Sequence, residues 1–159
     1  MNQPEIRDFA GKLLTGVRRR MSFVNDGTSE IWREFRRREG HIERRIGSES
    51  YSVKVYYAGY SFANFDPAAE FDKWAAAEVS GDCEGFDTLE IPAGKYAVFI
   101  HKGTAADAPR TFGYIFGEWL PGSGYELADR PHFEVLPAGY DPFDTQAKEE
   151  IWVPIEEKA

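Results

Sequence analysis

The most regular feature of the chain is a set of short segments in which apolar and polar residues alternate. A period of two is typical of β-strands that bury one face, whereas apolar residues three and four positions apart indicate a helix. Alternation predicts strands at Leu13–Phe23, Tyr51–Tyr57, Gly85–Ile91, Tyr96–Lys102, His132–Pro137 and Glu150–Ile155. Helical spacing predicts two helices, over Glu30–Glu39 and from Asp107 to Leu120.

An internal repeat settles the one ambiguous segment, Phe71–Val79, whose alanines favour a helix. The tripeptide Ala-Gly-Lys opens a predicted strand at residue 10 and again at residue 93. Each strand is followed by a helix, an alternating strand and a segment with a central Trp. Trp74 then corresponds to Trp152, so we predict a strand over Phe71–Val79.

The repeat also predicts the organisation of the whole chain. Its halves span residues about 8–80 and 84–156, and no linker or low-complexity tract separates them. We therefore expect one domain over residues 1–159, with an α+β fold built from a tandem β-α-β-β repeat and antiparallel sheets. Both helices should lie on one side of the sheets.

The last two predicted strands carry a carboxylate and a large aromatic ring, one in each strand. Glu134 alternates with Phe133 and Val135, and Trp152 alternates with an aliphatic set that includes Ile151. If the aliphatic sets face the core, Glu134 and Trp152 share the second face. A tryptophan is unusual on plain solvent surface, so this pair predicts the wall of a pocket.

Composition narrows the possible partners. The net charge of −8 argues against general binding of nucleic acid or of an anionic membrane and is compatible with cationic ligands. The arginine clusters at 18–20, 36–38 and 44–45 are therefore interpreted as solvated surface, although some could face an acidic protein partner. The single cysteine, Cys83, excludes an internal disulfide, and no segment resembles a signal peptide, so we predict a cytoplasmic protein.

Enzyme and metal motifs are not evident in the sequence. His41, His101 and His132 have no partners at metal-ligand spacing, and Cys83 stands alone. No nucleophile elbow, phosphate loop or Ser-His-Asp pattern is present. We accordingly predict neither a metal nor a cofactor.

The order of motifs in the second half resembles the GyrI-like superfamily, which includes the effector-binding domains of AraC- and MerR-type multidrug regulators. The resemblance covers nearly the whole chain and is strongest from Ile91 to Ile155. It rests on A-G-K-Y-A-V-F-I-H-K-G, E-W-L-P-G-S-G-Y, R-P-H-F-E-V-L and E-E-I-W-V-P-I, which begin at residues 93, 118, 130 and 149.

This resemblance implies a ligand groove between the two repeats, with Glu134 in the position of the glutamate that contacts cationic aromatic ligands. Many members have a tyrosine where this chain has Leu136, so the hydrogen-bonding part of the site is expected to differ. The motifs leave no room for a DNA-binding domain, so we expect a stand-alone binding protein without direct contact to nucleic acid or membrane.

Aromatic residues supply the predicted walls of the groove. A desolvated carboxylate favours a cationic ligand, and aromatic faces add cation–π attraction and stacking. Core packing is the competing interpretation for each ring, and it is weakest for Trp74 and Trp152 because the repeat places them on matching strands. The candidate ligand-binding residues are Glu134, Trp152, Trp74, Tyr96, Trp119, Trp32, Tyr114 and Phe112.

Two other functions are compatible with the sequence. Some stand-alone GyrI-like proteins hydrolyse strained, cyclopropane-type electrophiles, and Glu134 could act as a base on water with Tyr96 or Tyr114 orienting the substrate. Alternatively, the protein could be an interaction module that binds a partner such as DNA gyrase. The leading prediction is a binder of amphipathic, cationic, aromatic small molecules.

Overall fold

A single strongly bent antiparallel sheet organises the computed structural model, which describes residues 3–159. Its strands follow the order β1-β6-β9-β8-β3-β4-β2-β5, and β7 pairs with the C-terminal end of β9. The strands are β1 (Glu5–Phe9), β2 (Lys12–Met21), β3 (Ser50–Tyr56), β4 (Phe71–Glu78), β5 (Asp87–Ile91), β6 (Gly94–Lys102), β7 (Tyr125–Leu127), β8 (His132–Leu136) and β9 (Lys148–Glu157).

Two helical segments accompany the sheet. The first is α1 (Thr28–Arg38), which a short 3₁₀ turn extends over Glu39–His41. The second runs over residues 108–122 and consists of α2 (Ala108–Tyr114), a π-helical turn (Ile115–Trp119) and α3 (Leu120–Gly122). The prediction of two helices is therefore confirmed, and the π-helical turn is a feature that spacing alone did not indicate.

The segment Phe71–Val79 is a strand over nearly its whole length, as the repeat predicted. It lies as β4 between β2 and β3, and Ala75, Ala76 and Ala77 are fully buried there. Burial on both faces favours small side chains in this central strand, because Ala75 and Ala77 pack under α1 while Ala76 joins the core on the opposite face. Tertiary packing has overridden the helix propensity of alanine.

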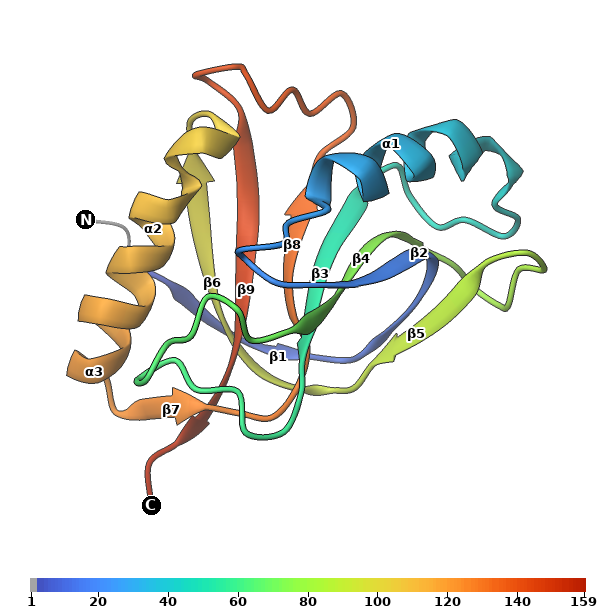
Figure 1. Cartoon of the computed structure of the whole chain (residues 1–159). Helices are drawn as coiled ribbons and strands as arrows, with labels where there is room; N and C mark the ends of the chain where they lie inside the picture. Colours follow the sequence, from blue (N-terminus) through green and yellow to red (C-terminus); the bar gives the residue numbers. More distant parts are fainter. Residues whose placement is uncertain (1–2) are drawn as a thin grey trace.

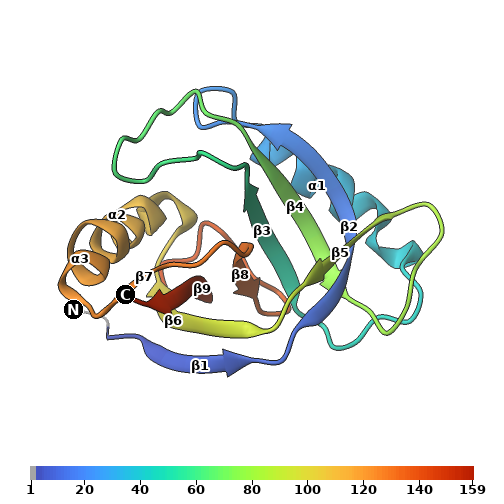
Figure 2. The same cartoon turned by 90° about the horizontal axis from the view of Figure 1, so that it is seen from below.

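The order strand, helix, strand, strand occurs twice, as β2-α1-β3-β4 and as β6-α2-β8-β9. The two units meet where β3 pairs with β8 at the centre of the sheet. Figure 2 shows α1 towards the β2 and β4 end of the sheet and the second helical segment towards the β6 and β9 end, with β3 and β8 between them. The fold is thus the expected α+β arrangement, with β1, β5 and β7 as additional strands; β1 and β7 were not predicted.

Both helices pack on the same face of the sheet, as predicted. Ile31 and Phe35 of α1 share a buried cluster with Val17 and Ala75, and Ile115 of the second segment shares one with Phe99. Pairing links these sheet residues through one continuous cross-strand row, Val17, Ala75, Ser52, Glu134, Ile151 and Phe99. Because residues opposite one another in a ladder share a face, this row also places Glu134 on the helix side.

The other face of the sheet carries an aromatic core. The Trp152 ring stacks on Phe133 with centroids 5.2 Å apart, and Phe9 and Tyr96 meet the same cluster edge-on. Trp74 is 4% exposed within this core. The bent sheet therefore buries both of its faces, one under the helices and one against itself.

The expectation that Glu134 and Trp152 share a face is wrong. The register pairs Phe133 with Trp152 and Glu134 with Ile151, so the carboxylate and the indole point to opposite sides. The prediction assumed that only the aliphatic side of β9 meets a core. In the structure the aliphatic side lies under the second helical segment and the aromatic side is buried as well.

Within the described part of the chain, no helix has the length and apolar character needed to cross a membrane. The longest helical stretches are those that pack on the sheet.

A glycine in β2 tests how tightly the central strands pack. Gly16 lies opposite Ala76, and a Cβ atom added to it would overlap the carbonyl oxygen of Ala75 in β4. We expect Gly16→Ala to lower the free energy of unfolding by about 1–3 kcal/mol, because a main-chain atom cannot move aside without shifting a strand.

Thermal unfolding should show this as a drop in Tm of roughly 2–4 °C for each kcal/mol lost. Gly113→Ala is the matched control, because a Cβ at this helical position meets nothing within 4 Å. It should leave the Tm unchanged or raise it slightly. A Gly16→Ala protein as stable as the parent would contradict the packing described for β2 and β4.

Candidate functional site

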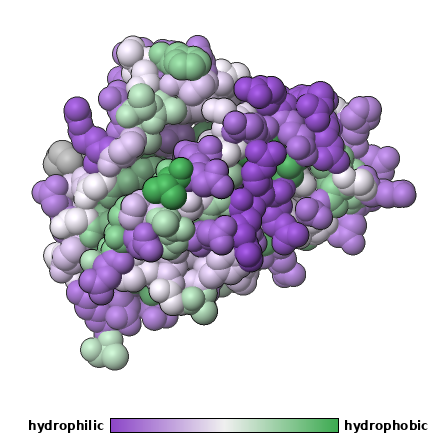
Figure 3. All heavy atoms as spheres, viewed as in Figure 1, coloured by the Kyte–Doolittle hydropathy of each residue, from purple (hydrophilic) through white to green (hydrophobic). Residues whose placement is uncertain are grey.

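Two adjacent cavities of about 620 and 790 Å³ lie on the helix face above the central strands. They share a floor that includes Ser52, Lys73 and Glu134 and a wall that includes Phe112. The two cavities together are referred to as the groove. Each volume falls within the range of typical small-molecule sites. Figure 3 shows hydrophilic side chains over α1 and a mixture of hydrophobic and hydrophilic ones in the middle of this face.

Aromatic rings form most of one end of the groove. They are Phe23, Tyr56, Tyr60, Phe62, Phe65, Phe71, Phe112, Phe116 and His132. Phe62 stacks on both Phe116 and His132, with centroids 4.9 and 5.5 Å apart, so the loop after β3 is tied to the second helix and to β8. The rings thus form one connected wall from separate elements.

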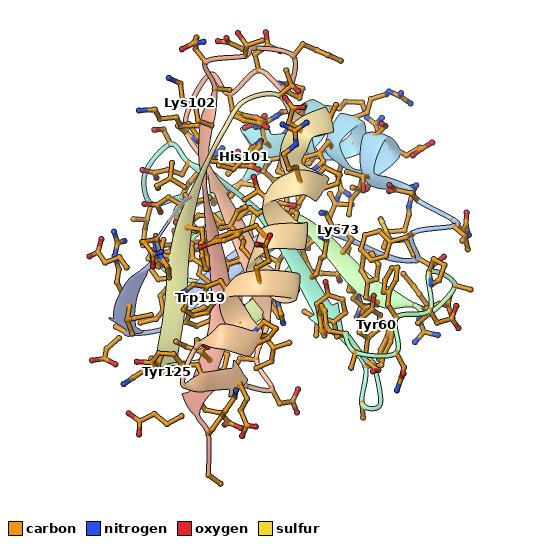
Figure 4. All side chains as sticks on the ribbon, turned by 90° about the vertical axis from the view of Figure 1, so that its left-hand side faces the viewer. Tyr60, Lys73, His101, Lys102, Trp119 and Tyr125 are labelled. Atoms are coloured by element: carbon orange, nitrogen blue, oxygen red, sulfur yellow. The ribbon has the colours of Figure 1, made fainter. Side chains whose placement is uncertain are left out.

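The floor between the helices carries charge. One cross-strand row consists of Lys73, Lys54 and His132, and the neighbouring row contains Ser52 and Glu134. Lys73 is 5% exposed and lines both cavities. Figure 4 shows Lys73 on the side of the second helical segment that faces α1.

Burial changes the protonation of this basic row. The pKa of Lys73 falls to about 8, first because burial disfavours its charged form and then because Lys54 is close. The pKa of His132 falls to about 3 for the same two reasons in the same order. His132 is therefore a neutral ring at physiological pH, and it acts as part of the aromatic wall.

A second carboxyl group lies beside Glu134. Glu149 of β9 is 4% exposed, and its pKa rises to about 8, first through burial and then through repulsion from Glu134. While it holds its proton it also hydrogen-bonds with Glu134. Burial, followed by the charges of Glu149 and Glu134, raises the pKa of Tyr140 to about 12. The floor can thus hold or release a proton within a carboxyl pair.

Four of the predicted site residues line the groove, and one of them, Trp152, borders only the smaller cavity. Glu134 lies on its floor, Phe112 contributes to both cavities, and Trp32 of α1 lines the larger one. Among residues 3–159, no basic side chain forms an ion pair with Glu134 within 4.0 Å. Their roles in ligand binding stay predictions.

The expectation that Trp74 and Trp152 face the groove is wrong for Trp74, and Trp152 only borders the groove. Trp74 is buried in the aromatic core on the opposite face. Trp152 borders the smaller cavity, but its ring stacks in the same core and its Nε1 donates to Glu150. Repeat symmetry did place both residues on matching strands, and both point away from the helices.

Tyr96, Trp119 and Tyr114 also lie outside the groove. Tyr96 is fully buried in the aromatic core, where its hydroxyl donates to the Pro131 carbonyl oxygen at 2.7 Å. Trp119 and Tyr114 pack with the core under the second helical segment, and Figure 4 shows Trp119 there, over β6 and β9. Helical periodicity cannot distinguish a ring that meets the sheet from one that meets a groove beside it.

Sequence reasoning missed Lys54, Lys73 and Glu149. The alternation along β3 could have indicated Lys54, because this residue lies on the same face as Ser52 and on the face opposite Val53 and Val55. Lys73 and Glu149 gave no such signal, since a charged residue in a strand is ordinarily expected on a solvated face. Only the pairing of β4 with β3 and of β9 with β6 shows that these positions are buried.

Solved structures share this fold at low sequence identity. SAV2435 bound to tetraphenylphosphonium superposes with a TM-score of 0.74 at 13% identity, covering 97% of this chain and 94% of that one. The EcmrR C-terminal domain gives 0.72 at 16% identity, with 99% of each chain covered. A hydrolase from Listeria innocua, encoded by lin2189, gives 0.58 at 10% identity over 97% of this chain and 92% of that one.

Sequence comparison leads to the same group of proteins. The transcriptional regulator BrlR of Pseudomonas aeruginosa is 29% identical over 138 residues, which is 84% of this chain and 48% of BrlR. The chain thus spans about half the length of this relative. The family model of the GyrI-like small molecule binding domain matches residues 2–156. The chain therefore belongs to the GyrI-like family of small-molecule-binding domains.

Proposed function

We propose that the groove binds amphipathic aromatic cations and that Glu134 is the counter-charge. The observation that carries this proposal is the position of Glu134 on the groove floor, with no ion pair to a basic side chain of residues 3–159 within 4.0 Å. A partly buried carboxylate without such a partner is stabilised when a ligand supplies the positive charge.

The wall of the groove already surrounds a cation of the protein itself. The ammonium nitrogen of Lys54 lies 4.9 Å from the ring centroid of Phe112 and 5.4 Å from that of Phe23. Both distances fall within the range of favourable cation–π contacts. These rings are therefore oriented so that their faces, which carry the negative part of the aromatic quadrupole, are available to positive charge.

Relatives support the same class of ligand. One structural neighbour is bound to tetraphenylphosphonium, a cation surrounded by four aromatic rings. BrlR is a transcriptional regulator, and EcmrR has been solved in a complex with DNA, which is consistent with effector binding in this fold. Under this proposal the chain retains the ligand-binding function of such domains.

Hydrolysis in the same groove has weaker support. Tyr96 and Tyr114, the tyrosines considered for orienting a substrate, both lie outside the groove. The likeness to hydrolases from Listeria innocua extends only to the fold. A binding role needs charge and aromatic contact alone, and both are present.

Removing the carboxylates should weaken cation binding. We expect Glu134→Gln/Glu149→Gln to lower the affinity for tetraphenylphosphonium at least tenfold, which corresponds to about 1.4 kcal/mol. The double variant is needed because Glu134 raises the pKa of Glu149, so that Glu149 becomes more acidic in Glu134→Gln and can take over the charge. Isothermal titration calorimetry at pH 7.5 measures the affinity directly.

Glu90→Gln/Glu126→Gln is the matched control, because it removes two exposed carboxylates from β5 and β7, away from the groove. It should bind as the parent does. Equal affinities in the parent and in the groove variant would refute the role of Glu134. Strained-ring electrophiles should be recovered unchanged, and turnover that is lost in Glu134→Gln would instead favour the hydrolase.

Cation affinity should increase as the pH rises from 7 to 9. Near pH 8 Glu149 loses its proton and gains a negative charge, while Lys73 loses a positive one. Both changes favour a bound cation. Glu134, Lys54 and Tyr140 are further ionisable groups that interact electrostatically with Glu149. We expect a tightening of up to about tenfold, since one pKa unit of coupling is about 1.4 kcal/mol.

Titrations with tetraphenylphosphonium, whose charge does not change with pH, isolate the contribution of the protein. In Glu149→Gln the pH dependence should shrink to the part due to Lys73. A cation affinity that falls between pH 7 and pH 9 would contradict the assigned directions of the two pKa shifts.

A further inference from the structure

The lysine pair on the floor of the groove is not explained by cation binding. Lys54 and Lys73 lie directly opposite each other on β3 and β4. Like charges in this position repel, and a buried ammonium is normally paired. Among residues 3–159, neither side chain has an ion pair within 4.0 Å, and Lys73 has no side-chain hydrogen bond although it is 5% exposed.

We propose that Lys54 and Lys73 form an anion subsite, so that the groove takes amphoteric aromatic molecules that carry both an anionic and a cationic group. The anionic group, most simply a carboxylate, bridges the two ammonium groups, and the cationic part of the ligand faces Glu134. This assignment rests on the proposed function for its cationic half, whereas the anion subsite has its own evidence and its own test.

The charges around the pair support an anionic partner. Burial and the mutual repulsion of the lysines both lower the pKa of Lys73, and a bound anion would oppose both effects. Glu134, Asp26 and Glu149 attract Lys73 from beyond ion-pair distance, and Glu149 keeps its proton below about pH 8. The floor therefore has no surplus of negative charge of the kind expected in a pocket for cations alone.

The second cavity adds further positive charge. Arg33 and Arg36 of α1 line it together with Lys73. Arg36 is engaged by Glu39, with 3.1 Å between Nη1 and Oε2, whereas no ion pair within 4.0 Å holds Arg33 among the described residues. An anionic group that enters between the helices thus meets cationic side chains from α1, β3 and β4.

Strand geometry sets the spacing of the two charges in the ligand. Lys54 lies opposite His132, and Glu134 is two residues further along β8 on the same face. Alternate residues of a strand are about 7 Å apart and neighbouring strands about 4.8 Å apart, so a point between Lys54 and Lys73 lies roughly 10 Å from Glu134 at the level of the backbone. A ligand that satisfies both subsites therefore carries its anionic and cationic centres at roughly this separation on a rigid aromatic frame.

Rhodamine B and its ethyl ester form a suitable pair of probes. Both carry the same delocalised aromatic cation, but only rhodamine B has a free carboxylate. At pH 7 we expect the protein to bind rhodamine B five- to tenfold more tightly than the ester, as measured by fluorescence anisotropy. Lys54→Met and Lys73→Met should each reduce this preference to less than twofold while retaining or improving binding of the ester.

Lys102→Met is the matched control, because this exposed lysine on β6 lies outside both cavities. It should keep the full preference for rhodamine B. The melting temperature of each variant establishes that it is folded, and Lys54→Met, at a less buried position, provides the test if Lys73→Met is unstable. Equal affinity of the parent for both dyes, or a preference that survives both lysine substitutions, would overturn the anion subsite.

The two proposals fail in different ways. If Glu134→Gln/Glu149→Gln binds the ester as the parent does, the cationic half is wrong, while the difference between the dyes still reports on the lysines. If neither dye binds, 9-anthracenecarboxylate decides, because it has only the anionic group. Binding that is lost in both lysine variants would support the subsite, and no binding to the parent would refute it.

Discussion

The pairing of β3 with β8 is the interaction on which the groove depends. It joins the two strand-helix-strand-strand units at the centre of one sheet and leaves the helices separated on the same face. It also fixes the floor between them, because Ser52 comes to lie opposite Glu134 and Lys54 opposite His132. A slip of one residue would turn Glu134 and Lys54 towards different faces and would remove the charged floor.

Several parts of the fold could be predicted from sequence because they depend on local patterns. Alternation located the strands of both repeats, and the repeat itself identified β4 against the helix propensity of its alanines. The position of Glu134 on the groove floor also follows from its phase in β8. Trp74 and Trp152 were misplaced because their orientation depends on which strand pairs with which, and on a second buried face that a bent sheet creates.

The second helical segment shows the same limit. The helical spacing of Phe112, Ile115, Phe116 and Trp119 is that of a single apolar face, but these residues meet two environments in the structure. Ile115 and Trp119 pack on the sheet, where Trp119 meets Phe99 edge-on with centroids 5.2 Å apart. Phe112 and Phe116 also pack against the buried cluster that includes Ile115 and Phe99, and in addition they line the groove. The helix contacts two environments at once, and periodicity records only that these positions are apolar.

The aromatic core on the opposite face of the sheet explains how the protein tolerates the loss of stability caused by buried charged groups in the groove floor. Buried groups such as Lys73 and Glu149 reduce stability when they are ionised without close partners. On the opposite face of the same sheet, Phe133, Trp152 and Tyr96 pack in one aromatic cluster that also includes residues of both edge strands, Phe9 of β1 and Ile91 of β5. Trp74 and Trp152, which sequence reasoning assigned to the ligand, thus belong to the layer below the groove floor. They hold rigid the strands whose other face presents the charges, and a rigid arrangement of unpaired charges can favour a ligand of complementary charge.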